Sequence, residues 1–151
     1  MNYSELTIYR HRLPHWRLEG NVYFVTWRLH PNQECFKPEE RDIVKSSLEY
    51  FDGKRYRLFA FVVMDDHVHV LFIPLGDHRI QDLVHTWKSF TAHEAQRRFN
   101  RRGSVWQDEY FDRIVRDEAE FLEKGNYILQ NPRKRWPDIE DYPWVGLGKD
   151  G

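Results

Sequence analysis

Residues 55–74, RYRLFAFVVMDDHVHVLFIP, contain two apolar runs that are separated by a pair of aspartates. Both runs are rich in β-branched and aromatic residues, which favour strands. The run over 55–64 is almost continuously apolar, which indicates a strand at the centre of a sheet. Because only Asp65 and Asp66 separate it from the run over 67–74, we expect the two strands to form a tight hairpin.

Strand and helix patterns alternate on both sides of this hairpin. The sequence predicts a strand over 21–29, a helix over 37–51, a long helix over 77–102, a strand near 110–115 and a helix over 117–131. We expect the last helix to stop before Pro132, which cannot continue it, and the tail after it to be irregular. The order β-α-β-β-α-β predicts one α+β domain over 1–151 of the ferredoxin-like, split βαβ type, with helices backing an antiparallel sheet.

Composition limits the class of protein. With 40% apolar residues, a chain of 151 residues can bury one core. The single cysteine, Cys35, excludes an intramolecular disulfide and fits a reducing compartment. The start of the chain has no apolar signal segment, and the longest apolar run is too short to span a bilayer. We therefore expect a soluble, cytosolic protein that does not interact with membranes.

Two histidines, His67 and His69, stand one residue apart in the second strand of the hairpin. Strand alternation puts both side chains on one face, about 6.6 Å apart along the strand. Two imidazoles at this spacing can bind one divalent metal ion. They can also be hydrogen-bonded residues of the core, and the short motif alone favours this second interpretation.

A second pair, Tyr127 and Asn131, lies four residues apart on the last predicted helix and therefore shares one face. The Asn131 amide oxygen is a ligand type that suits Mg²⁺ or Mn²⁺, and the Tyr127 hydroxyl is a possible nucleophile. Taken alone, Tyr127 could instead lie at the margin of the core, and Asn131 could simply end the helix. Tyr110 is a rival nucleophile, but it has no ligand-type partner at helical spacing.

The net charge of −1 gives no global attraction for nucleic acid, so any such interaction depends on local patches. Three segments combine basic residues with aromatic neighbours, a pattern that suits single-stranded nucleic acid. A solvated charged helix face remains an equal explanation for the long helix. The candidate DNA-binding residues are Arg10, Arg12, Trp16, Arg17, Lys88, Arg97, Arg98, Arg101, Arg102, Arg133, Lys134 and Arg135.

The segments "RLPHW…GNVYFVTWRL", "FVVMDDHVHVLF", "VWQDEYFDRIVRDE" and "YILQNP", in this order, resemble the REP-associated tyrosine transposases, relatives of the HUH single-strand DNA transposases. The resemblance implies that His67, His69 and Asn131 hold a divalent metal, Mg²⁺ or Mn²⁺. It also implies that Tyr127 attacks single-stranded hairpin DNA, which yields a 5′-phosphotyrosine and a free 3′-OH. A monomer is expected because this branch is associated with monomers, although other relatives form homodimers with shared sites.

The chain departs from the pattern of that family at two places. Asp65 stands where the family has proline, and "RKRWPDIEDY" replaces an apolar segment after "NP". Two other functions stay open from the sequence. A ferredoxin-like module could bind nucleic-acid hairpins without cutting them, and a hydrolase could use the histidine pair with a metal-bound water. Covalent capture of DNA distinguishes the tyrosine mechanism from both.

Overall fold

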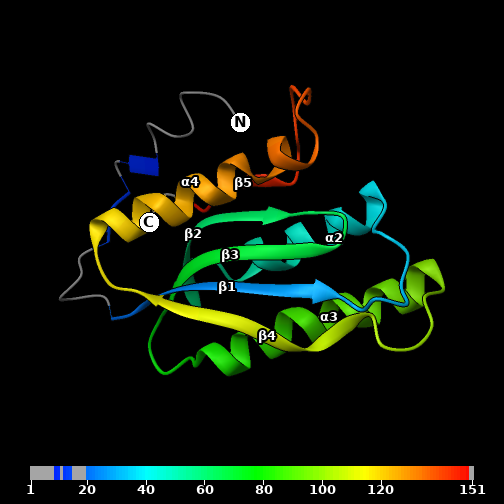
Figure 1. The fold of residues 1–151 in the computed structure, drawn as a ribbon. Helices are drawn as coiled ribbons and strands as arrows, with labels where there is room; N and C mark the ends of the chain where they lie inside the picture. Colours follow the sequence, from blue (N-terminus) through cyan, green and yellow to red (C-terminus); the bar gives the residue numbers. More distant parts are fainter. Residues whose placement is uncertain (1–8, 11, 15–19, 150–151) are drawn as a thin grey trace.

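The hairpin predicted from residues 55–74 forms the centre of a five-stranded antiparallel sheet (Figure 1). Its strands are β2 (Tyr56–Val63) and β3 (His67–Pro74), and the sheet order is β4-β1-β3-β2-β5. The computed structural model describes residues 9–10, 12–14 and 20–149. Within them the order β-α-β-β-α-β and the ferredoxin-like arrangement are confirmed.

The other elements lie close to their predicted ranges, except for β5, which was not predicted. They are β1 (Val22–Leu29), α2 (Pro38–Tyr50), α3 (Ile80–Phe99), β4 (Trp106–Val115), α4 (Glu118–Arg135) and β5 (Val145–Leu147). The long helix ends at Asn100, which adopts the left-handed conformation, and the fourth strand begins earlier than predicted. No described helix is both long enough and apolar enough to cross a membrane.

Two expectations for the C-terminal region are wrong. Helix α4 does not stop before Pro132 but continues to Arg135, with the backbone N–H of Trp136 donating to the Pro132 carbonyl. Proline costs the helix one hydrogen bond, but Pro132 is buried against the fold, and this packing offsets the loss. The tail is not wholly irregular either, because the three residues of β5 pair with β2 and cover its edge.

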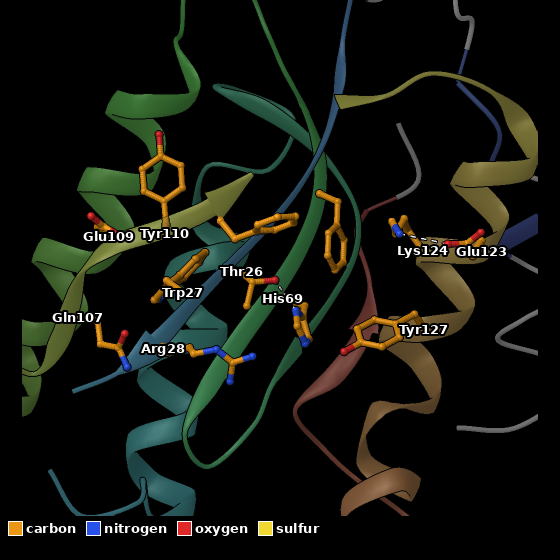
Figure 2. A pocket seen from close by; sticks show the side chains of 12 residues that line it. Thr26, Trp27, Arg28, His69, Gln107, Glu109, Tyr110, Glu123, Lys124 and Tyr127 are labelled. Carbon is orange, nitrogen blue, oxygen red and sulfur yellow. Dashed lines mark hydrogen bonds and ion pairs between the residues drawn. The ribbon is translucent and has the colours of Figure 1, made fainter. Parts of the chain in front are cut away.

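The sheet has helices on both faces, which Figure 1 shows as three layers. Val68, Val70 and Phe72 of β3 pack in the core beneath α2 and α3. His67 and His69 alternate with them and therefore point toward α4, which covers part of the opposite face with its own apolar core (Figures 1 and 2). The antiparallel β3 strand thus presents both histidines to the helix that carries Tyr127 and Asn131.

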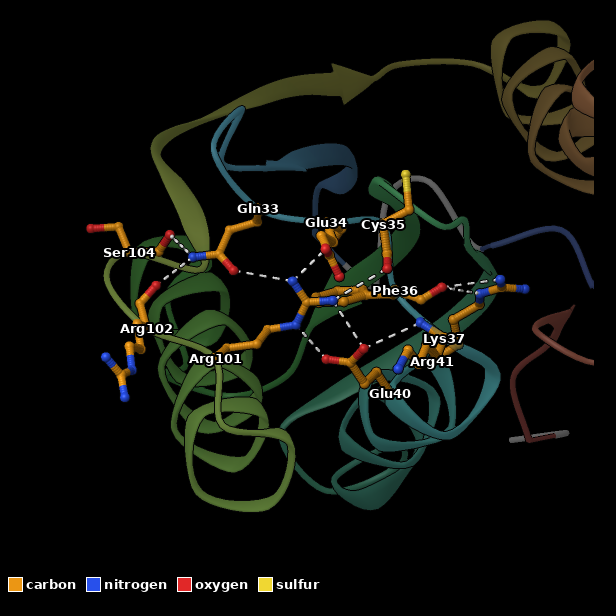
Figure 3. A network of polar contacts seen from close by, with 10 residues as sticks. All are labelled: Gln33, Glu34, Cys35, Phe36, Lys37, Glu40, Arg41, Arg101, Arg102 and Ser104. Atoms are coloured by element: carbon orange, nitrogen blue, oxygen red, sulfur yellow. Dashed lines mark hydrogen bonds and ion pairs between the residues drawn. The ribbon is translucent and has the colours of Figure 1, made fainter.

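A buried ion pair ties α2 to the loop after α3 (Figure 3). The Arg101 guanidinium donates to both carboxylate oxygens of Glu40, and the two side chains are 9% and 3% exposed. The same guanidinium donates to Gln33 Oε1 and to the backbone carbonyls of Glu34 and Cys35. All these contacts lie within the protein, so the structure gives Arg101 a role in folding that differs from the DNA contact expected from its charge.

We expect Arg101→Ala to lower the free energy of unfolding by about 3–5 kcal/mol, because Glu40 would be left as a buried, unpaired carboxylate. The matched control is Arg102→Ala, since Arg102 is exposed and contributes its backbone carbonyl to Gln33, so the change should cost no more than about 0.5 kcal/mol. Urea denaturation of both variants measures the difference. Equal, small losses would contradict the structural role of Arg101.

Candidate active site

His69 lies at the centre of the face that α4 partly covers, and it is almost fully buried. It stands opposite Thr26 across β1 and β3, and its Nδ1 is 2.6 Å from Thr26 Oγ1. Its other ring nitrogen, Nε2, is buried without a hydrogen-bond partner among the described residues. Because an unpaired buried polar atom is costly, Nε2 is a strong indication of a missing partner at this place.

Burial, followed by the charges of His67, Arg28 and Lys134, lowers the pKa of His69 to about 3. The imidazole is therefore neutral at physiological pH. A neutral imidazole has one nitrogen with a free lone pair, which is the form that binds a metal.

His67, the neighbour on the same face, is held by a carboxylate. Its Nδ1 lies 2.7 Å from Asp66 Oδ1. Burial raises the pKa of Asp66, but the hydrogen bond and charge of His67, with Arg135 and Arg28, outweigh it and leave this pKa lowered. An ionised carboxylate only accepts, so Nδ1 of His67 carries a proton and donates it to Asp66.

Asn131 meets His67 from α4, with its Oδ1 3.3 Å from His67 Nε2. When His67 is neutral, both atoms are acceptors, and neither can donate to the other. Two atoms with free lone pairs are expected this close together when both bind the same cation. Two ligand atoms that each lie about 2.1 Å from an octahedral Mg²⁺ ion are roughly 3 Å apart. The rings of His67 and His69 lie 4.7 Å apart, centroid to centroid, so a third donor is adjacent.

A metal site at this place would have to use an amide oxygen. In the described part of the chain, no group of three His, Cys, Asp or Glu side chains is placed to hold a metal ion. A site here therefore needs the oxygen of Asn131 beside the two imidazoles, which is a set suited to a hard or borderline divalent ion.

Tyr127 lies beside His69, one turn before Asn131 on α4. Its ring packs edge-on against His69 at 5.2 Å and lies 6.1 Å from Phe24. Lys134 Nζ lies 4.5 Å from the ring centroid. The side chain is 37% exposed, and Figure 2 shows its hydroxyl directed toward the side where His69 lies.

The rival Tyr110 lies on the other side of the sheet. It pairs with Trp27 across β1 and β4 and packs against the core beneath α2 and α3. Burial, followed by the charge of Asp112, raises the pKa of Tyr110, which disfavours a phenolate. Tyr127, and not Tyr110, therefore faces the histidines.

The last turn of α4 is anchored to the hairpin that carries the histidines. Arg135 donates to Asp65 Oδ2 at 2.8 Å, and its other terminal nitrogen lies 3.8 Å from Asp66 Oδ2. Asp65 stands where the resembled family has proline, so this chain has an ion pair at that position. At the other end of α4, Asp117 caps the helix by accepting from the backbone of Glu120 at 2.8 Å.

A pocket of about 640 Å³ opens beside Tyr127 and His69, between α4 and the uncovered half of the sheet (Figure 2). Arg28 lines it and pairs with His67 across β1 and β3. Sequence reasoning missed Arg28, because its place beside the histidines depends on the strand register. The alternation of Phe24, Thr26 and Arg28 on one face was the available signal.

The predicted DNA-binding residues do not form one surface. Arg133, Lys134 and Arg135 lie in the last turn of α4, next to the site. Lys88, Arg97 and Arg98 belong to α3 on the opposite side of the sheet, where Lys88 donates to backbone carbonyls of β4 and Arg97 and Arg98 contact Glu94. Arg102 and Arg10 are exposed, Arg12 donates to the Gly148 carbonyl, and Trp16 and Arg17 lie outside the described residues.

Two known transposases are similar to this chain in sequence. A REP-associated tyrosine transposase of Haemophilus influenzae is 24% identical over 148 residues, covering 87% of this chain and 82% of that protein. A REP-associated tyrosine transposase of Escherichia coli is 21% identical over 140 residues, covering 88% of this chain and 80% of that protein.

Two solved structures share the fold. A REP-associated tyrosine transposase bound to a REP hairpin superposes with a TM-score of 0.70 at 19% identity, covering 85% of this chain and 77% of that chain. A Deinococcus radiodurans transposase gives 0.54 at 22% identity, covering 77% and 92%.

Residues 20–131 match the family model of the IS200-like transposases, which is most of the chain. The resemblance seen in the sequence is therefore confirmed. The protein belongs to the IS200-like transposase family and is a transposase enzyme, similar to the REP-associated tyrosine transposases.

Proposed function

We propose that this transposase is a metal-dependent tyrosine nuclease and strand transferase that acts on single-stranded DNA beside a hairpin. One observation carries the proposal: His67, His69, Asn131 and Tyr127 converge on a single point between β3 and α4. These residues lie up to 64 positions apart in the sequence. Each of them has an ordinary structural explanation alone, but their convergence has none.

His67, His69 and Asn131 would hold Mg²⁺ or Mn²⁺. The unpaired Nε2 of His69 and the facing acceptors of His67 and Asn131 fit such an ion. The bound ion would supply positive charge to the scissile phosphate, which eases attack by an anionic nucleophile. Asp66 would fix the orientation and tautomer of His67.

Tyr127 would be the nucleophile. Its oxygen forms a bond to phosphorus while the bond from phosphorus to the 3′-oxygen breaks, which leaves a 5′-phosphotyrosine and a 3′-OH. The ester keeps the energy of the broken bond, so a second 3′-OH can reverse the reaction without ATP. Lys134 Nζ lies over the Tyr127 ring, and this cation–π contact helps to hold the ring in place.

The substrate class follows from the relatives and the site. One solved relative is described as bound to a REP hairpin. We propose hairpin DNA as the substrate of this chain too, because Arg28, Lys134 and Arg135 lie around the site, where they can contact phosphates. All four reacting groups come from one chain, which supports action as a monomer, and a homodimer is not needed to complete the site.

Tyr127→Phe should abolish covalent capture of DNA while leaving affinity within about threefold of wild type. The change removes one oxygen and keeps the ring contacts with His69 and Phe24. The measurement is a denaturing gel of protein incubated with labelled hairpin DNA and Mn²⁺. Tyr110→Phe is the matched control and should still form the adduct. An adduct with Tyr127→Phe that is lost with Tyr110→Phe would transfer the role to Tyr110, and a cut without any adduct would indicate a metal-bound water instead.

The buried, neutral His69 also makes stability depend on pH. In the unfolded chain a histidine titrates near pH 6.5, whereas the folded His69 has a pKa of about 3. Between these values the unfolded state binds more protons, so stability is lost as the pH falls below 6.5 and the loss continues down to about 3. Above 6.5 this contribution is fully present.

We expect His69→Gln, measured by urea denaturation with EDTA present, to lose less stability than wild type between pH 7 and pH 5. The difference should be about 2 kcal/mol, which is the cost of keeping a neutral imidazole at pH 5. The control is His85→Gln, an exposed histidine on α3 that should leave the pH dependence unchanged. Parallel pH curves for wild type and His69→Gln would contradict the buried, neutral state of His69.

A further inference from the structure

A row of three side chains crosses the sheet next to the site. Thr26 of β1 pairs with His69 of β3 on one side and with Phe111 of β4 on the other. Directly opposed residues on neighbouring strands point to the same face. Phe111 therefore lies on the His69 side of the sheet, two strand spacings or about 10 Å from His69.

Phe111 is exposed although it borders the pocket beside the site. It is 58% exposed, and it and Tyr127 are the large exposed aromatics that line this pocket. Helix α4 lies over β2 and β3 and leaves the face of β4 open, so no described element covers the ring. An exposed aromatic ring beside the proposed reaction centre indicates a binding surface, because a ligand that packs on the ring would remove its apolar face from water.

The charged side chains around this pocket, which we call the groove, limit what can bind in it. Arg28 lines its floor and Lys124 its α4 wall, where Lys124 also contacts the Phe24 ring and Glu123. Glu109 lines the β4 side, and Glu123 lines the α4 side beside Lys124. An anionic backbone is therefore attracted toward Arg28 on β1 and repelled by Glu109 on β4. Its bases would then face β4, where Phe111 lies.

We propose that Phe111 is a stacking platform for an unpaired base of the DNA strand that carries the scissile phosphate, with Arg28 contacting that strand's backbone. The inference rests on the proposed function and deepens it, because it assigns the recognition of single strands to a particular side chain. A duplex offers its base faces to neighbouring pairs and cannot place one on Phe111. The groove thus selects unpaired DNA within about 10 Å of the histidines.

The test is a binding experiment with EDTA present, so that neither metal nor cleavage affects the result. Three labelled probes share one hairpin stem: one has unpaired thymidine tails on both sides, one has the same tails paired to complementary strands, and one has abasic tails. Wild type should bind the unpaired tails most tightly. Phe111→Ala should weaken that binding about 5- to 100-fold and leave binding to the abasic tails unchanged.

Two further variants separate stacking from a general loss of structure. Phe111→Trp keeps an aromatic face and should retain wild-type affinity. Phe90→Ala removes an aromatic of similar exposure, 50%, from α3 on the other side of the sheet and should have no effect. Thermal unfolding of each variant confirms that the fold is intact, and Phe111→Leu serves if Phe111→Ala unfolds.

Three outcomes would overturn the proposal: equal binding of paired and unpaired tails by wild type, unchanged binding by Phe111→Ala, or an equal loss with the abasic tails. The proposed chemistry is judged separately by the Tyr127 adduct. If the adduct forms but Phe111→Ala binds the unpaired tails as wild type does, only the stacking platform is wrong. If Phe111→Ala weakens binding to the unpaired tails but no adduct forms, only the proposed chemistry is wrong.

Discussion

The proposed reaction centre depends on the contact between the last turns of α4 and the β2–β3 hairpin. Asn131 reaches His67, and Arg135 reaches Asp65 and Asp66. A shift of α4 by one helical turn, about 5.4 Å, would separate Tyr127 and Asn131 from the histidines. The ion pair at Asp65 would therefore support the proposed function through position, because it helps to hold α4 where Asn131 meets His67.

The same site is a local weakness of the fold. His69 is buried with an unpaired nitrogen and a strongly lowered pKa, which means that folding must remove an imidazole from water without full compensation. Such conflicts are expected where a residue serves chemistry and not packing. The surrounding structure offsets the cost through well-packed cores on both faces of the sheet and through the buried pair of Arg101 and Glu40.

Local patterns in the sequence were sufficient for most of the elements and for the fold class, but not for β5, the end of α4 or the strand register. The range 67–74 was predicted as β3 has it, and the four-residue spacing of Tyr127 and Asn131 put both on one helix face. The strand register, which brings Arg28 and Thr26 opposite the histidines, depends on pairings between distant segments. The predicted end of α4 before Pro132 was wrong because packing outweighs the local cost of proline. The ion pair of Arg101 with Glu40 was not predicted because charge alone does not reveal a buried partner.

The central proposal is that one strand of the hairpin, β3, and one helix, α4, together supply the ligands of a single metal site. Crystals soaked in Mn²⁺ and measured at a wavelength where manganese scatters anomalously test it most directly. The account predicts one strong anomalous peak within coordination distance of His67 Nε2, His69 Nε2 and Asn131 Oδ1, and no such peak in crystals of His67→Ala. A wild-type peak elsewhere, or full occupancy of this place in His67→Ala, would contradict the account.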